Sequence, residues 1–169
     1  MRIAFLGDSC TEGSPGASCF RLLHRRLGTH ELWNHGRAGD SVADLYARMQ
    51  NTGLEPVDLA FRWLGTNDAA VGPWAPWAAE TFEPVTWAST LGQLAAVYRR
   101  LLAWVLERAP TVVCVPPVAA DGLVGPWERR VEDLSGVVNA AVLAEEAAVL
   151  LDLAAAFAAA AADRCDSGR

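Results

Sequence analysis

Residues 2–13, RIAFLGDSCTEG, begin with a short apolar run that stops at a glycine, an aspartate and a serine. The run Ile3–Leu6 has the composition of a buried strand, because its apolar residues are consecutive rather than alternating with polar ones. Gly7, Asp8 and Ser9 then place a turn, a carboxylate and a hydroxyl directly at the carboxyl end of that strand. Three interpretations are open for these residues: a tight structural turn, a phosphate-binding loop or the seat of a nucleophile.

Length and composition indicate one folded domain, which we place at residues 1–169. Hydrophobic residues make up 52% of the chain and charged residues 20%, which is typical of a globular protein. The net charge of −6 argues against a nucleic-acid partner. No apolar stretch is long and unbroken enough to span a membrane, and the N-terminus lacks the zones of a signal peptide, so we expect a cytoplasmic protein. The four cysteines form no CxxC pair and have no histidine at ligand spacing, and we expect no metal and no cofactor.

Short apolar runs alternate with longer amphipathic segments along the chain. Strands are predicted at Arg2–Leu6, Glu31–Asn34, Val57–Leu64, Thr111–Val115 and Ala148–Leu151. Helices are predicted at Ala17–Leu27, Ser41–Gln50, Trp87–Arg108, Trp127–Glu146 and Leu153–Ala162. This alternation is typical of an α/β protein in which helices cover both faces of a parallel sheet. Ligands bind such sheets at the carboxyl ends of the strands, which is where residues 7–9 lie.

Three of the predicted strands end in residues that suit one kind of chemistry. The first ends in residues 7–9, GDS, the second runs into residues 34–41, NHGRAGDS, and the third into residues 65–68, GTND. Because the strands are parallel, a hydroxyl, a glycine N–H and a carboxamide would converge at one edge of the sheet. Acyl transfer needs such a set, a nucleophile with donors aimed at an oxyanion. The glycine spacing of residues 7–13 matches neither GxGxxG nor a Walker loop, which argues against a phosphate-binding loop.

These three blocks resemble the SGNH hydrolases, also called GDSL esterases or lipases. The resemblance covers residues 1–68 by motif and extends to about residue 153 by the order of elements. It implies a three-layer α/β/α domain of flavodoxin-like topology with a five-stranded parallel sheet. It also implies that Ser9 is the nucleophile, and that the Ser9 N–H, the Gly39 N–H and the Asn67 side-chain amide bind the oxyanion. The implied activity is hydrolysis of a small-molecule ester, with acyl transfer to another acceptor as an alternative.

Each of these residues also has a structural interpretation. Ser9 suits a helix N-cap, Gly39 a backbone position of positive φ, and Asn67 an Asx turn. Asp8 is expected to position the turn and face the substrate rather than act as a base, because it directly precedes the candidate nucleophile. Cys10 is expected to be a packed thiol, since its side chain should point away from that of Ser9.

The sequence lacks a histidine where the resemblance requires one. A serine hydroxyl needs a base, and the family supplies a histidine from an Asp-x-x-His block after the fifth strand. This chain has only His24, His30 and His35, and Ala155 stands where a histidine would follow Asp152. One explanation is that the domain lacks its C-terminal Asp-x-x-His block and closing helix. The other is a genuine loss of the pair, which would leave a non-catalytic binding module or an enzyme in which a residue such as His35 replaces the base.

Residues 69–86, AAVGPWAPWAAETFEPVT, form a long connection with no helical or strand period. Connections of this length inside a compact domain are typical of lids and binding loops. Trp74 and Trp77 either patch the edge of the core or line a pocket, and both interpretations stay open. With Asp8, these two tryptophans are our candidate substrate contacts. The sequence leaves the identity of the ester and the oligomeric state open.

Overall fold

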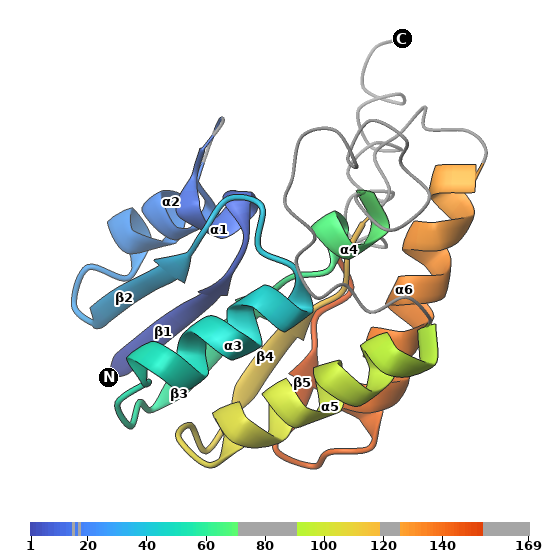
Figure 1. The fold of residues 1–169 in the computed structure, drawn as a ribbon. Coiled ribbons are helices and arrows are strands. Elements are labelled where there is room, and N and C mark those ends of the chain that lie inside the picture. Colours follow the sequence, from blue (N-terminus) through green and yellow to red (C-terminus); the bar gives the residue numbers. More distant parts are fainter. Residues whose placement is uncertain (15, 17, 71–90, 119–125, 154–169) are drawn as a thin grey trace, which may run out of the picture.

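The computed structural model describes residues 1–14, 16, 18–70, 91–118 and 126–153 (Figure 1). Within these residues, one five-stranded parallel sheet has the strand order β2-β1-β3-β4-β5. The strands are β1 (Arg2–Gly7), β2 (Glu31–Gly36), β3 (Leu59–Trp63), β4 (Val112–Val115) and β5 (Ala148–Leu150). All five strand predictions are confirmed, with ends that differ by no more than two residues. The strand order is that of flavodoxin-like proteins, so the predicted fold class is also confirmed.

Six helices lie between these strands in the part of the chain that the structure describes. They are α1 (Ser9–Glu12), α2 (Cys19–Arg26), α3 (Val42–Thr52), α4 (Thr66–Ala70), α5 (Leu91–Leu106) and α6 (Pro126–Leu143). Four of them match predicted helices, whereas α1 and α4 were not predicted. The predicted start of the third helix, at residues 87–90, and nearly all of the predicted helix 153–162 lie outside the described residues.

The N-cap of α3 lies where the sequence predicts the helix to begin. Ser41 is the N-cap, in extended backbone, and its side chain accepts a hydrogen bond from the Asp44 N–H. The Asp44 carboxylate in turn accepts from the Ser41 N–H at 3.0 Å, which completes a capping box. These bonds determine where the loop after β2 stops and α3 begins.

Successive side chains of β1 are buried on opposite faces of the sheet. Ala4 and Leu6 belong to the main core, together with Leu45 of α3 and residues of α5 and α6. Phe5 points to the other face, where its ring packs edge-on against Phe20 of α2 at a centroid distance of 5.3 Å. Because both faces are covered, β1 is apolar from Ile3 to Leu6. Figure 1 shows α3, α5 and α6 along one face of the sheet.

The strand order reverses between β1 and β3, which are hydrogen-bonded neighbours. In open parallel sheets this switch point opens a crevice at the carboxyl ends of the strands, where ligands bind. Figure 1 shows α1 and α4, the two helices that follow β1 and β3, at that same end of the sheet. No helix in the described part of the chain is long and apolar enough to cross a membrane.

Candidate active site

The turn after β1 is held tightly against its neighbours. An added Cβ on Gly7 would lie 2.2 Å from Oγ1 of Thr11 and 2.5 Å from the carbonyl oxygen of Trp63. Only glycine therefore lets α1 pack this closely on β1 and β3. The chain then turns directly into α1, with Asp8 as the N-cap and Ser9 as the first helical residue. Ser9 is thus not the cap itself, which corrects the structural interpretation of its hydroxyl.

Asp8 uses one of its two carboxylate oxygens to position this turn. Its side chain is 1% exposed, and Oδ1 accepts a hydrogen bond from the Cys10 N–H at 3.0 Å. Oδ2 is buried without a hydrogen-bond partner. Burial raises the pKa of Asp8 above its usual range, against the opposing effect of the Cys10 N–H. Burial, followed by the nearby Asp8 charge, raises the pKa of Cys10 to about 11, so this thiol stays protonated at neutral pH.

The loop that carries Gly39 is tethered to both β1 and α1. The Arg37 N–H donates to the Gly7 carbonyl at 3.0 Å, and the Ala38 N–H donates to Oε2 of Glu12 at 2.7 Å. Gly39 itself is exposed and has a φ of +86°, a left-handed conformation that favours glycine. The loop on which the Gly39 N–H sits is therefore fixed relative to the helix that begins with Ser9.

Helix α4 holds the same loop from the side of β3. Nδ2 of Asn67 donates to the carbonyl oxygen of Asp40 at 3.0 Å, directly after Gly39 in the chain. The Asp68 carboxylate accepts from the Val42 N–H, at 3.0 Å and 3.3 Å to its two oxygens. Asn67 and Asp68 thus bind two successive parts of the connection between β2 and α3. Neither makes the Asx turn that sequence allowed, since Asn67 lies inside a helix.

Burial changes the electrostatics of these carboxyl groups. It raises the pKa of Asp68 to about 7, although the Val42 N–H bond opposes the shift, and the charges of Asp44 and Asp8 add to it. Burial also raises the pKa of Asp40, against the opposing effect of Arg48. The site edge therefore gathers carboxyl groups that hold protons more strongly than free aspartate does.

Arg48 completes the support of the Gly39 loop from α3. Its Nε and Nη2 donate to Oδ2 of Asp40 at 2.9 Å and 2.6 Å. Nη2 also donates to the carbonyl oxygen of His35 at 2.8 Å. Asp40 is 5% exposed, and such a paired, charge-assisted contact is the arrangement that a buried carboxylate needs.

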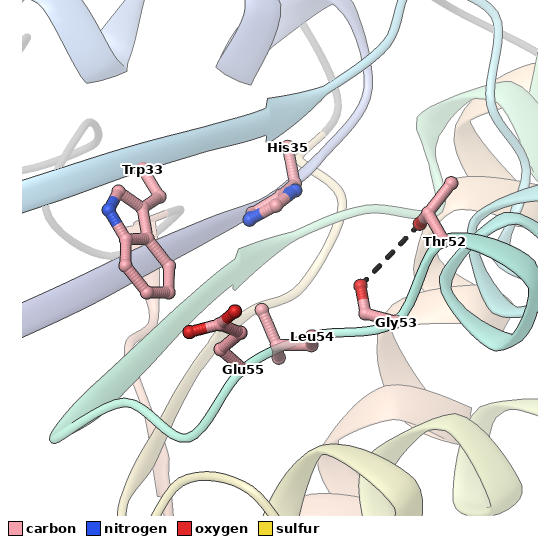
Figure 2. A pocket seen from close by; sticks show the side chains of 6 residues that line it. All are labelled: Trp33, His35, Thr52, Gly53, Leu54 and Glu55. Carbon is pink, nitrogen blue, oxygen red and sulfur yellow. Dashed lines mark hydrogen bonds between the residues drawn. The ribbon is translucent and has the colours of Figure 1, made fainter.

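The structure brings together the loops of Ser9, Gly39 and Asn67, as the three sequence blocks predicted. Trp74 and Trp77 lie outside the described residues. The histidines of the chain lie elsewhere: His24 is in α2, where its ring packs against Phe20, and His30 lies in the turn before β2. His35 does not turn toward Ser9 but lines a separate cavity with Trp33 and Leu54 (Figure 2).

Sequence reasoning did not identify Glu12, Arg48 or Asp68 as residues of the site. All three act through contacts across the sequence: 26 residues separate Glu12 from Ala38 and Val42 from Asp68. The spacing of Glu12 to Ser9 places both in one helical turn, but nothing in the sequence indicates its partner. Among the described residues, no group of His, Cys, Asp and Glu side chains could hold a metal ion.

Two comparisons with known proteins bear on this site. A family model, the GDSL-like lipase/acylhydrolase family, matches residues 5–168. No curated protein sequence matches the chain. Many solved structures share the fold.

Three solved structures illustrate this similarity. The acetyl xylan esterase AlAXEase superposes with a TM-score of 0.77 at 19% identity, over 100% of this chain and 85% of its own. The acetylxylan esterase Axe2 from Geobacillus stearothermophilus has a TM-score of 0.71 at 20% identity, over 92% of this chain and 77% of its own. A lipolytic protein of the G-D-S-L family from Veillonella parvula DSM 2008 has a TM-score of 0.70 at 16% identity, over 100% and 84%. At these identities the likeness shows the shared fold.

Proposed function

Because the chain belongs to the GDSL-like lipase/acylhydrolase family, we propose that it is a serine esterase that works through an acyl-enzyme on Ser9. Oγ of Ser9 forms a bond to the ester carbonyl carbon and loses its proton to a base. The alcohol then leaves with that proton, and water releases the acid from the acyl-enzyme. The observation that carries this proposal is the Asn67–Asp40 hydrogen bond, because it ties the carboxamide to the Gly39 loop beside the Ser9 turn.

The oxyanion of the tetrahedral intermediate binds to the Ser9 N–H, the Gly39 N–H and the Asn67 amide. Such donors lower the barrier only when they are held in place before the reaction. The tethers from Glu12 and Asp68 supply that rigidity. Burial raises the pKa of the Cys10 thiol to about 11, so this thiol offers no thiolate beside Ser9 at neutral pH.

The base in this proposal is a histidine, and none of the three histidines of the chain lies in the Ser9 turn. His24 and His30 belong to α2 and to the turn after it, and His35 lines a different cavity. Imidazole added to the solution should therefore restore part of the activity. Acetyl and other short acyl esters, including acetylated sugars, are the substrates to test first, since two of the structural neighbours are acetyl xylan esterases.

The test measures hydrolysis of 1-naphthyl acetate by the chain and by Ser9→Ala, in imidazole buffers of increasing concentration. Subtracting the Ser9→Ala rate removes hydrolysis by imidazole alone and leaves the Ser9-dependent rate. We expect that rate to rise with imidazole, and a longer form of the chain with an Asp-x-x-His block to work without it. Equal rates for both proteins, in every buffer, would contradict the assignment of the nucleophile.

A non-catalytic binding module is the second candidate function. The observation that favours it is the location of the three histidines away from the Ser9 turn. A folded chain that shows no Ser9-dependent rate, with imidazole or in a longer form, would support this function instead. If methanol or another alcohol captures the acyl group faster than water does, the reaction is acyl transfer.

A further inference from the structure

A second cavity lies on the flank of the sheet, between β2 and the loop that follows α3 (Figure 2). Its volume is about 390 Å³. The lining residues are Trp33 and His35 of β2, Thr52 at the end of α3, and Gly53, Leu54 and Glu55 of the loop. Figure 2 shows the indole and imidazole rings projecting from neighbouring positions of β2, across from Leu54 and Glu55. Ser9, Gly39 and Asn67 are not among its lining residues, so this cavity is separate from the candidate active site.

Two polar groups of the lining, the indole N–H of Trp33 and the hydroxyl of Thr52, already donate hydrogen bonds within the protein. The indole Nε1–H of Trp33 donates to Oε1 of Glu31 at 3.0 Å. The hydroxyl of Thr52 donates to the carbonyl oxygen of Arg48 at 3.0 Å. The groups left for a ligand are therefore acceptors, namely the lone pairs of the Thr52 oxygen and the exposed carboxylate of Glu55.

His35 adds no positive charge to the cavity. Burial, with the nearby Arg48 charge, lowers the pKa of His35, so the ring is neutral at pH 7. A neutral ring does not repel a cation bound beside it.

Among the lining residues the charge is negative. Glu55 lies in the lining, and Glu31 holds the edge of the Trp33 indole, so two carboxylates flank the ring. The positive charge of Arg48, which acts on His35, is paired with the Asp40 carboxylate at 2.6 Å, and its guanidinium also donates to the carbonyl oxygen of His35. An anionic ligand would meet repulsion here, whereas a cation would be attracted to both the carboxylates and the indole face.

We propose that this cavity binds a small organic cation, a protonated primary amine on an apolar body. The ammonium group lies over the indole of Trp33 and donates to the Glu55 carboxylate. The apolar body contacts Leu54, which is buried beneath the cavity. This binding does not depend on the esterase reaction, because the two sites share no lining residue.

The indole N–H signals of nitrogen-15-labelled protein report this binding directly. The chain has seven tryptophans, and Trp33→Phe identifies the signal of Trp33. Benzylammonium is the probe, with benzyl alcohol and benzoate as its neutral and anionic counterparts of similar shape. We expect benzylammonium to shift the Trp33 signal with saturation, with the other two binding at least threefold more weakly. Glu55→Gln should weaken the benzylammonium affinity about three- to fivefold, which is the size expected for one exposed charge.

Glu132→Gln, which removes an exposed carboxylate on α6, is the matched control and should leave the affinity unchanged. Two results would overturn the proposal. If benzyl alcohol binds as well as benzylammonium, the cavity is an apolar surface without preference for cations. If benzylammonium leaves the Trp33 signal in place at 20 mM or so, the cavity has no measurable affinity for amines.

Discussion

The side-chain amide of Asn67 has two N–H groups, one for the protein and one for the proposed oxyanion. Its nitrogen has two N–H groups, and the bond to the Asp40 carbonyl uses one of them. In the proposed mechanism the other donates to the oxyanion. The bond to Asp40 thus orients the catalytic donor, which is the preorganisation that makes such a donor effective.

Asn67→Ala should therefore lower the Ser9-dependent kcat by about 10²- to 10³-fold, with a much smaller change in KM, because the donor acts on the transition state. The measurement is the saturation curve for 1-naphthyl acetate in imidazole buffer. Asn51→Ala, an exposed asparagine of α3, is the control for loss of an amide. A KM effect without a kcat effect would assign Asn67 to substrate binding.

Asp68 should make stability depend on pH. Its pKa is about 7 in the folded protein and near 3.8 when unfolded, so the folded state binds the extra proton between these values. The free energy of unfolding therefore falls as pH rises from about 4 to 7, and levels off above 7. Asp68→Asn should reduce this decrease, since asparagine keeps an oxygen to accept from Val42 but does not ionise in this range.

Urea unfolding of both proteins at pH 4.5 and pH 7.5 measures the difference. Asp8 and Asp40 also have raised pKa values and contribute a decrease of the same sign. His35, whose pKa is lowered, contributes an increase as pH rises. Asp68→Asn should therefore make the change in stability between the two pH values less negative. An identical pH effect in the two proteins would show that Asp68 ionises normally.

At the scale of elements, Glu12 connects α1 to the loop after β2. It is the last residue of α1, and its carboxylate accepts from the Ala38 N–H at 2.7 Å. Helix α1 has four residues and little internal support, so contacts with its surroundings must hold it in place. The Glu12 bond therefore fixes the turn of Ser9 and the loop of Gly39, two parts of the candidate active site, relative to each other.

Glu12→Ala should lower the Ser9-dependent kcat about tenfold, because the Gly39 N–H loses its fixed position relative to Ser9. Glu12→Gln retains an oxygen that accepts from Ala38 and should keep most of the activity. The two variants are compared in the same naphthyl acetate assay. Equal losses in both would indicate that the charge of Glu12, rather than its hydrogen bond, is what matters.

At the scale of the whole molecule, the core contains a buried cation. Arg62 of β3 is 1% exposed, its guanidinium stacks 3.9 Å from the centre of the Tyr98 ring, and Nη2 donates to Sγ of Cys114 at 3.5 Å. Its Nε and Nη1 have no hydrogen-bond partner. A buried charge without a carboxylate partner destabilises a fold, and the cation–π contact offsets only part of that effect.

Arg62→Met fills a similar volume without a charge, and should raise the free energy of unfolding by about 1–2 kcal/mol. Urea unfolding of the purified chain at pH 7.5 provides the measurement. Arg62→Ala should instead lower stability, since it leaves a cavity beside Tyr98. A loss of stability in Arg62→Met would show that the ring and thiol contacts outweigh the burial of the charge.

The amino-acid sequence was enough to predict the strands, their parallel arrangement and the three loops at one sheet edge. These follow from local signals: consecutive apolar residues in Ile3–Leu6, and glycine, aspartate and asparagine directly after the strands. The helices α1 and α4 were not predicted. They have only four and five residues, which is too short for a hydrophobic period to indicate a helix. Their existence depends on packing.

The side chains that hold the loops together could be identified only in the folded protein. Glu12, Arg48 and Asp68 bind backbone groups that lie 13 to 26 residues away in the chain, and no local pattern encodes such a pairing. The same holds for His35, whose position near the catalytic loops suggested a base but whose side chain faces the flank cavity. Successive residues of a strand point to opposite faces, so the direction of a side chain at a strand end depends on the pleat and on which elements pack there.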